Sequence, residues 1–221
     1  KNLYGNNIFG LTCDITNKSE LKKILSLIIE KYGKVTGLIN NAANDPKVGN
    51  DIHSQQLTRF ENFPHSRWQQ DLDVGLTGSF LCSQVFGEYM AQSKKGVIVN
   101  IASDLSVISP DQSLYTVDGL SANSQPVKPI SYSVVKTGII GLTKYLATYW
   151  SNCNIRVNAI SPGGVYNNQN EEFVKRLEKK IPMNRMAQRD EYKGSILYLL
   201  SEASSYLTGF NLVVDGGRSC W

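Results

Sequence analysis

The sequence has few of the features that mark membrane, metal-binding or nucleic-acid-binding proteins. Of its 221 residues, only 4 are cysteines and 2 are histidines. It contains no apolar run as long as the roughly 18 residues that a transmembrane helix needs, which excludes such a helix. The 23 basic and 19 acidic residues leave a net charge of +4, spread along the chain. Because no basic stripe is present, binding to nucleic acid has little support.

The cysteines and histidines do not form the pattern of a zinc site or a disulfide framework. The cysteines lie far apart, at Cys13, Cys82, Cys153 and Cys220. Neither histidine, His53 or His65, has a cysteine pair nearby. We therefore expect no metal and four reduced, mostly buried thiols. Residues 1–10 contain no apolar leader core, so we expect a cytoplasmic location.

Short apolar runs alternate with helical patterns along the chain, and 41% of the residues are hydrophobic. The predicted strands are 8–13, 35–40, 96–101, 154–160 and 210–214. The predicted helices are 19–32, 66–92, 131–150, 171–180 and 190–203. Strands separated by helices at this spacing predict parallel βαβ units with right-handed crossovers. The expected fold is therefore α/β, a doubly wound, Rossmann-like parallel sheet in a single domain over 1–221.

The helix predicted at 19–32 has recognisable ends. Apolar residues repeat at helical spacing between positions 21 and 28. Asn17, with Glu20 three residues later, predicts an N-terminal capping box. Gly33 is expected to end the helix.

Each predicted strand is followed by small or polar residues. These clusters are Asp14-Ile15, Asn40-Asn41-Ala42-Ala43, Asn100-Ile101-Ala102-Ser103, Ser161-Pro162-Gly163-Gly164 and Asp215-Gly216-Gly217. One such cluster is typical of an ordinary turn. A cluster at every strand end favours a ligand site, because ligands of doubly wound sheets bind beyond the carboxyl ends of the strands.

The segment Tyr132-Ser133-Val134-Val135-Lys136 opens the helix predicted at 131–150. Residues four apart share a helical face, so the phenol and the ammonium can project into one pocket. A neighbouring cation lowers the pKa of a tyrosine from about 10, which suits proton exchange with an alcohol or carbonyl oxygen. Taken alone, such a pair more often marks a solvated helix face. We interpret Tyr115 as a loop residue and Tyr145 as a core residue.

Together these residues resemble the short-chain dehydrogenase/reductase family over nearly the whole chain. The matching segments are Asp14-Ile15, Asn40 to Ala43, Asn100 to Ser103, Tyr132 with Lys136, Arg156 to Gly164, Ile181 to Arg185 and Val214 to Gly217. The resemblance implies hydride transfer between NAD or NADP and a carbonyl or secondary alcohol. It also implies a homodimer or homotetramer that pairs through the helices at 66–92 and 131–150.

The resemblance assigns a role to individual residues. Tyr132 is the implied general acid/base, Lys136 supports it and holds the nicotinamide ribose, and Ser103 bonds the substrate oxygen. Tyr132 and Lys136 thus also count among the cofactor-binding residues. The other implied cofactor contacts are Asp14 and Ile15 at the adenine, Asn40 and Ala42 at the ribose, and Pro162, Gly163 and Val165 at the nicotinamide.

Gly75 departs from the family pattern. The family usually has an asparagine at this place, which orders a water in the proton relay to the lysine. Either Gly75 allows close helix packing despite its low helix propensity, or the relay is weaker in this chain.

The spacing between Ser103 and Tyr132 is about twice that usual in the family. The additional residues, 104–130, contain three prolines and are predicted to form a loop on the substrate side. An insertion here resembles a branch found in bacterial gene clusters for flagellin glycans and nonulosonic acids. That branch implies a sugar phosphate or nucleotide sugar as substrate.

The glycine-rich turn that holds the pyrophosphate in this family does not precede Asp14. We therefore expect that the sequence lacks its N-terminal glycine-turn βαβ portion, and the choice between NAD and NADP stays open. An alternative function is a dehydrogenase-like protein that binds a nucleotide or a partner with little or no turnover. Gly75 and the missing turn favour this alternative, whereas Ser103, Tyr132 and Lys136 favour an enzyme.

Overall fold

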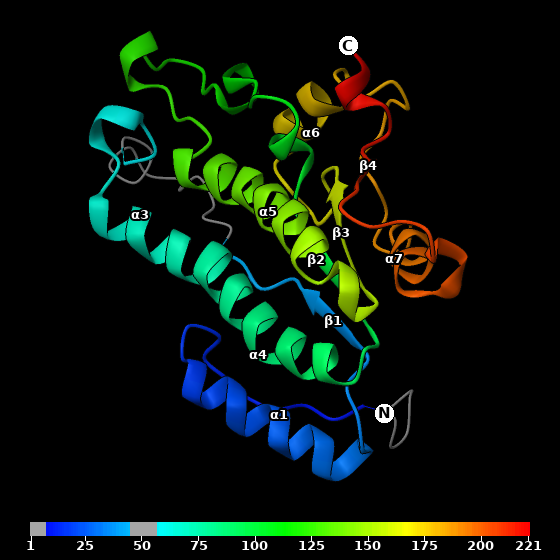
Figure 1. Cartoon of the computed structure of the whole chain (residues 1–221). Helices are drawn as coiled ribbons and strands as arrows, with labels where there is room; N and C mark the ends of the chain where they lie inside the picture. Colours follow the sequence, from blue (N-terminus) through cyan, green and yellow to red (C-terminus); the bar gives the residue numbers. More distant parts are fainter. Residues whose placement is uncertain (1–7, 45–56) are drawn as a thin grey trace.

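The computed structural model describes residues 8–44 and 57–221 (Figure 1). Its sheet has four strands in the order β1-β2-β3-β4, namely Gly37–Asn40, Gly96–Ile101, Ile155–Pro162 and Asn211–Val214. Every neighbouring pair is parallel, with Val99 opposite both Ile39 and Asn158. The prediction of a parallel α/β sheet is therefore confirmed.

Helices separate the strands along the chain. They are α1 (Lys18–Tyr32), α3 (His65–Leu72), α4 (Gly78–Gln92), α5 (Ile130–Tyr149), α6 (Glu171–Glu178) and α7 (Lys193–Leu200). The single helix predicted at 66–92 is interrupted by a π-helical turn, Asp73–Thr77, that joins α3 to α4. None of the helices within the described ranges has the length and apolar character required to cross a membrane.

The side chains of β2 alternate between two apolar layers, as the period of a strand requires. Ile98 packs into the cluster that α1, α4 and α5 build on one face of the sheet. Val97 and Val99 pack with Leu199 of α7 on the other face. In Figure 1 α4 and α5 lie side by side over the sheet, with α1 along α4 and α7 beyond β3. The sheet is therefore covered on both faces, as its continuous apolar strands indicate.

The predicted ends of α1 are confirmed. The side-chain oxygen of Asn17 accepts hydrogen bonds from the backbone N–H groups of Ser19 and Glu20 (3.1 and 3.4 Å). Gly33 ends the helix in the left-handed conformation, with φ of 78°, which an L side chain rarely adopts. The capping box differs in one contact, because Glu20 accepts from the backbone of Asp14 (2.9 Å).

Two predictions from the sequence are wrong, the strand at 8–13 and the core position of Tyr145. Residues 8–13 do not form a strand in the described structure, since a strand needs a neighbour for its backbone groups and none of the described strands pairs with them. Phe9 instead packs edge-on against Tyr32 of α1 (6.4 Å between ring centroids). Tyr145 is 63% exposed and stacks on Tyr149, because the face of α5 that meets the core carries Leu146.

Candidate active site

Tyr132 and Lys136 lie one turn apart near the start of α5. Pro129 precedes the helix, and its carbonyl accepts a hydrogen bond from the backbone N–H of Tyr132 (3.3 Å). Nζ of Lys136 lies 5.9 Å from the centroid of the Tyr132 ring. The lysine is buried and the tyrosine half-buried. The structure thus brings the phenol and the ammonium together, as the i,i+4 spacing predicts.

Lys136 also fixes the start of α5 to the sheet. Its Nζ donates a hydrogen bond to the carbonyl oxygen of Ile101 (2.8 Å), the last residue of β2. Ser103 follows two residues later and is buried. The three predicted catalytic residues therefore gather at the carboxyl end of β2, where a parallel sheet places its ligands.

The hydroxyl of Ser103 is held by its own turn. It donates to Oδ1 of Asp104 (2.9 Å) and accepts from the backbone N–H of Leu105 (3.2 Å). This arrangement caps the 3-10 turn Asp104–Ser106. Sequence reasoning did not foresee Asp104, whose only signal is its position next to the expected serine.

A second ammonium lies against the Tyr132 ring. Nζ of Lys128 is 3.8 Å from the ring centroid, within the range of a cation–π contact. The backbone around it is fixed, because Val127 donates to Oγ1 of Thr58 (3.0 Å) and Lys128 donates to Oε1 of Gln112 (2.8 Å). Sequence reasoning missed Lys128, because it lies four residues before Tyr132 but ahead of the start of α5, where helical spacing does not apply.

Residues 104–129 form a loop without an α-helix, and the predicted loop ends one residue late because α5 begins at Ile130. The loop contains three 3-10 turns, Asp104–Ser106, Gln112–Tyr115 and Ala122–Ser124. Gln125 holds its outer part together, because its side chain accepts from the N–H of Val117 (2.8 Å) and donates to the carbonyl of Leu120 (2.8 Å). The inserted loop is thus internally bonded.

Polar contacts tie the inserted loop to α6 and to the residues that follow it. Nη1 of Arg176 donates to the carbonyl and the hydroxyl of Thr116 (2.6 and 2.7 Å). Nζ of Lys180 lies 3.1 Å from Oδ2 of Asp111. The hydrogen bond from the Ser113 hydroxyl and the Lys180 ammonium lower the pKa of Asp111 to about 2. The carboxylate of Asp111 is therefore charged at all ordinary pH values.

Gly75 lies in the π-helical turn and is buried against α5. A Cβ atom at this position would lie 2.5 Å from Cγ1 of Val135, the residue before Lys136. No side chain fits there unless Val135 moves. The geometry favours the packing interpretation of Gly75, and π-helical turns are frequent at functional sites.

The predicted adenine contacts lie on the loop before α1. Asp14 is exposed, and its Oδ1 accepts from both the N–H and the hydroxyl of Thr16 (2.9 and 2.7 Å). These two bonds, the hydroxyl first, lower the pKa of Asp14. Ile15 packs over α4, where a Cβ on Gly78 would lie 2.5 Å from its Cδ1.

Asn40 ends β1 within a buried amide network. Its Nδ2 donates to Oγ of Ser83 (3.0 Å) and to Oδ1 of Asn100 (2.8 Å), and Asn100 donates in turn to Oγ1 of Thr143 (2.8 Å). The network ties β1 and β2 to α4 and α5. The side-chain nitrogen of Asn40 is therefore occupied by protein, whereas Ala42, after the strand, is exposed.

The predicted nicotinamide contacts follow β3. Pro162 is the last residue of the strand, and Gly163 lies so close to β4 that a Cβ would be 3.0 Å from Cα of Asp215. Val165 forms an isolated parallel bridge with Ala187. The carbonyl of Gly163 accepts from the Tyr192 hydroxyl (2.8 Å). Burial, followed by the carboxylates of Asp104, Glu191 and Asp215, raises the pKa of Tyr192 to about 12.

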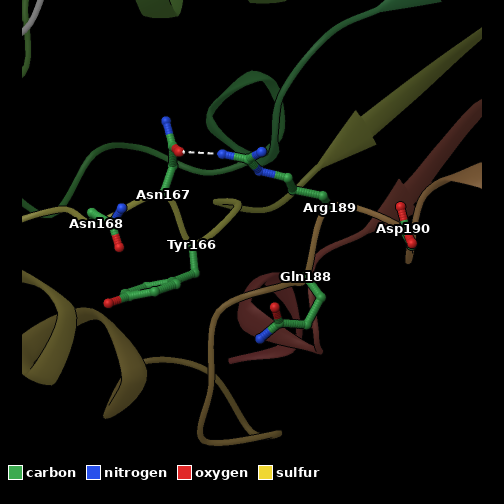
Figure 2. A pocket seen from close by; sticks show the side chains of 6 residues that line it. All are labelled: Tyr166, Asn167, Asn168, Gln188, Arg189 and Asp190. Atoms are coloured by element: carbon green, nitrogen blue, oxygen red, sulfur yellow. Dashed lines mark hydrogen bonds between the residues drawn. The ribbon is translucent and has the colours of Figure 1, made fainter. Parts of the chain in front are cut away.

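Two hollows lie beside the segments that follow β3. The larger, of about 390 Å³, is lined by Tyr166, Asn167, Asn168, Gln188, Arg189 and Asp190 (Figure 2). Across it, Nη2 of Arg189 donates to Oδ1 of Asn167 (2.7 Å). The smaller, of about 80 Å³, lies beyond the ends of β3 and β4. Neither hollow is lined by the three predicted catalytic residues.

The histidines contribute no metal cluster to the described part of the chain. His65 begins α3 and is exposed. Within residues 8–44 and 57–221, no group of three or more His, Cys, Asp or Glu side chains is arranged to hold a metal ion. His53 lies outside the described residues.

Two models of known protein families match the chain. Residues 1–118 match the family model described as short chain dehydrogenase. Residues 116–219 match the model described as enoyl-(acyl carrier protein) reductase. The chain belongs to the short-chain dehydrogenase family. It is an NAD(P)-dependent oxidoreductase of that family, and the resemblance stated from its motifs is confirmed.

Individual relatives are similar over nearly the whole chain. D-arabinitol 2-dehydrogenase [ribulose-forming] of Scheffersomyces stipitis is 35% identical over 95% of this chain and 70% of the relative. Post-translational flagellin modification protein A of Campylobacter coli is 30% identical over 98% of this chain and 80% of the relative. The crystal structure of a short-chain dehydrogenase from Leptospira borgpetersenii with bound NAD⁺ superposes with a TM-score of 0.82, at 33% identity, over 95% of this chain and 74% of that one.

Proposed function

We propose that the protein oxidises a secondary alcohol, or reduces the corresponding carbonyl, on a polyol or sugar-derived substrate, with Tyr132 as general acid/base. One observation carries the proposal, the gathering of Tyr132, Lys136 and Ser103 at the carboxyl end of β2. NAD(P), when bound, supplies or accepts the hydride. The protein then has to position the reacting oxygen and exchange its proton.

Tyr132 is suited to the proton exchange. The ammonium groups of Lys136 and Lys128 lie 5.9 and 3.8 Å from its ring centroid, and positive charge favours phenolate over phenol. In oxidation the phenolate takes the proton of the alcohol, and in reduction the phenol returns a proton to the carbonyl oxygen. Ser103, at the same strand end, hydrogen-bonds the reacting oxygen and fixes its position.

The residues at the strand ends fit a dinucleotide. Asp14 uses only Oδ1 for its two bonds to Thr16, so Oδ2 suits an adenine amino group. The exposed Ala42 is a small residue after β1 and leaves room there for a ribose. Lys136 presents an ammonium for ribose hydroxyls. This donor set does not choose between NAD and NADP.

The inserted loop at 104–130 is the proposed substrate side of the site. It begins one residue after Ser103 and places Lys128 on the Tyr132 ring, so it borders the reacting oxygen from both ends. The positive charge of Lys128 suits a substrate with an anionic group, such as a sugar phosphate or a nucleotide sugar. The similarity to a flagellin modification protein supports this class, and the similarity to an arabinitol dehydrogenase supports a polyol.

The test is an assay with NAD⁺ or NADP⁺ and a panel of polyols, sugar phosphates and nucleotide sugars, read as reduced nicotinamide. Tyr132→Phe is expected to lower kcat roughly 10²- to 10⁴-fold, because it removes the general acid/base. Tyr145→Phe, an exposed tyrosine on the same helix, is the matched control and is expected to keep full activity. Undiminished activity of Tyr132→Phe would contradict the catalytic assignment.

A binding function without turnover is the competing outcome of the same assay. If the protein binds reduced nicotinamide by fluorescence yet turns over no member of the panel, the alternative of a weak or inactive dehydrogenase-like protein is favoured. Binding and turnover are therefore measured on the same preparation.

We also propose that the protein forms a homodimer or homotetramer through α4 and α5. These helices expose Phe80, Tyr145 and Tyr149, each at least 45% exposed. Exposed apolar surface of this kind supports association. Light scattering of the protein and of Tyr149→Lys measures it, and a monomer at all concentrations would contradict the proposal.

A further inference from the structure

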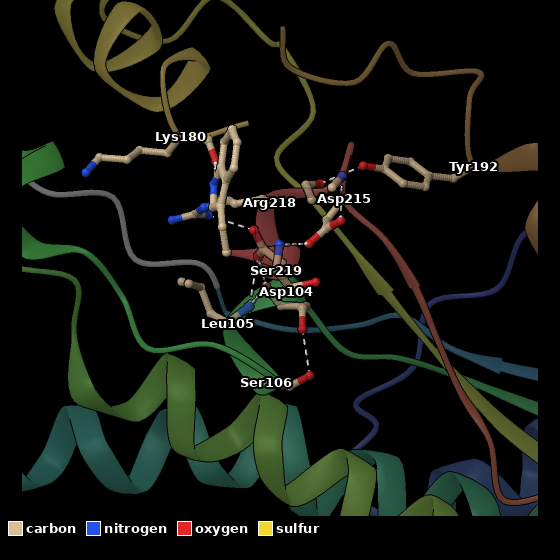
Figure 3. Close-up of polar contacts among 12 residues, drawn as sticks. Asp104, Leu105, Ser106, Lys180, Tyr192, Asp215, Arg218 and Ser219 are labelled. Atoms are coloured by element: carbon tan, nitrogen blue, oxygen red, sulfur yellow. Dashed lines mark hydrogen bonds and ion pairs between the residues drawn. The ribbon is translucent and has the colours of Figure 1, made fainter. Parts of the chain in front are cut away.

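An ion pair joins the C-terminal turn to the residue after Ser103. Nη1 of Arg218 lies 2.6 Å from Oδ2 of Asp104, across a sequence separation of 114 residues. The two side chains are only 10% and 5% exposed. Figure 3 shows Arg218 reaching over the turn that carries Asp104. A buried pair of this kind requires both partners, because either charge alone is costly in the interior.

The turn before Arg218 fixes the direction of its side chain. The two carboxylate oxygens of Asp215 accept from the backbone N–H groups of Gly217 (2.9 Å) and Ser219 (2.7 Å). Gly216 and Gly217 have φ of 68° and 88°, a conformation that side chains rarely adopt. The Asp-Gly-Gly sequence after β4 therefore forms a rigid turn that delivers Arg218 to the end of β2.

Asp104 divides its two oxygens between Arg218 and the expected catalytic serine. Oδ2 accepts from Arg218, while Oδ1 accepts from the Ser103 hydroxyl (2.9 Å) and the N–H of Leu105 (2.8 Å). A serine hydroxyl has a single proton, and a carboxylate only accepts. The orientation of the Ser103 hydroxyl is therefore set by Asp104, and that of Asp104 by Arg218.

The backbone of the same turn has an independent anchor. Oγ of Ser106 donates to the carbonyl of Ser103 (2.6 Å) and lies 3.0 Å from Oγ of Ser161 in β3. The N–H of Ala102 donates to the carbonyl of Ile160 (2.8 Å). Changes at Asp104 or Arg218 are thus expected to act on the serine hydroxyl more than on its backbone.

We propose that Asp104 and Arg218 are positioning residues for Ser103. Asp104 holds the hydroxyl in place, and Arg218 shares the carboxylate so that the serine hydroxyl can turn and donate a hydrogen bond to the reacting oxygen. This inference rests on the role of Ser103 in the proposed function. It gives the C-terminal turn a part in catalysis although the turn contains none of the expected catalytic residues.

Arg218→Met is expected to lower kcat roughly tenfold to a hundredfold, since small displacements of a positioned group have effects of this size. The KM for the cofactor is expected to stay the same. Arg218→Lys retains the charge and is expected to recover part of kcat. Arg156→Met is the matched control, because Arg156 donates to Leu199 and Ser201 at the end of α7, on the opposite face of the sheet from α5. It is expected to lower the melting temperature without lowering kcat.

A double variant separates positioning from stability. Asp104→Leu with Arg218→Met removes both charges, and apolar replacement of a buried pair is often neutral for stability. We expect the melting temperature to recover towards that of the unaltered protein while kcat stays low, because Ser103 has lost its acceptor. Recovery of kcat together with the melting temperature would overturn the inference and leave the pair a structural contact only.

A Ser103→Ala background distinguishes this inference from the proposed function. If Ser103→Ala alone keeps full activity, the proposed role of Ser103 fails. If Ser103→Ala is impaired, adding Arg218→Met is expected to lower kcat no further. An equal additional loss in that background would show that Arg218 acts elsewhere, and the inference would be wrong while the proposed function stands.

Discussion

The first half of α5 contains the buried lysine of the helix and a hydrogen bond to a buried aspartate, whereas the second half packs mainly through apolar side chains. Near the start, Oγ of Ser131 donates to Oδ2 of the buried Asp71 (2.5 Å), and Lys136 bonds to the end of β2. Near the end, Leu146 and Trp150 belong to the apolar cluster that α1, α4 and α5 share. Buried polar groups need specific partners, while apolar groups need only close packing. The first half is therefore built for chemistry and the second for stability.

Trp150 offers the most severe test of this comparison. It is 7% exposed, and it lies so close to α4 that a Cβ on Gly87 would be 2.2 Å from its ring. Trp150→Ala is expected to lower the free energy of unfolding by about 3–5 kcal/mol, measured by urea denaturation. Tyr206→Ala, at a fully exposed tyrosine outside α4 and α5, is the control and is expected to change it little. If folded Trp150→Ala also lost kcat, the division between the two halves would be wrong.

Gly75 packs against Val135 in the first half of α5, and a substitution there is expected to change the free energy of unfolding by a smaller amount. Gly75→Ala is expected to cost about 1–3 kcal/mol, because its Cβ would collide with Val135, even though alanine is the better helix former. Combining it with Val135→Ala makes room and is expected to recover stability, measured as a double-mutant cycle.

Activity in the same variants separates the two interpretations of Gly75. Under the packing interpretation, Gly75→Asn with Val135→Ala folds and its kcat does not exceed that of Val135→Ala. A rise in kcat would instead show that the usual asparagine relay is missing from this chain.

Local patterns were sufficient to predict most of the fold. The continuous apolar runs at β2 and β3 and the Asn17 cap of α1 depend on neighbours in sequence. The segment at 8–13 also has a strand composition, but composition supplies no pairing partner. The π-helical turn within the helix predicted at 66–92 was not visible either, and its Gly75 packs against Val135 of another helix, a contact that no local pattern reveals.

The candidate site also combines contacts that local spacing predicts with contacts that it does not. Tyr132 and Lys136 were predictable because i,i+4 spacing alone puts them on one face. Asp104 and Arg218 were not, since their contact spans 114 residues and depends on the turn after β4. A long-range contact of this kind requires the tertiary structure. The approach of Lys128 to Tyr132 is local, but Lys128 lies before the start of α5, so helical spacing alone does not predict it.

The smallest expected effect is a pH-dependent change in the stability of the inserted loop, which leads into the polar end of α5. The pKa of Asp111 is lowered to about 2 by the Ser113 hydroxyl and Lys180. Because the folded pKa lies below the usual value near 3.8, the contribution of Asp111 to stability is complete above that value and is lost as the pH falls through about 2. The Asp111 side chain is 35% exposed and that of its partner Lys180 is 53% exposed, so solvent screens the pair and the effect on global stability is expected to be small.

Amide hydrogen exchange in the turn Gln112–Tyr115 measures this contribution locally. We expect exchange there, corrected for its intrinsic pH dependence, to lose protection between about pH 4 and pH 2, while the apolar end of α5 around Leu146 keeps its own. Asp111→Asn is expected to show the unprotected turn already at neutral pH, with kcat for a large substrate affected more than kcat for a small one. Equal loss of protection in the turn Gln112–Tyr115 and around Leu146 would mean that acid acts on the whole fold, and that the loop is not held separately by Asp111.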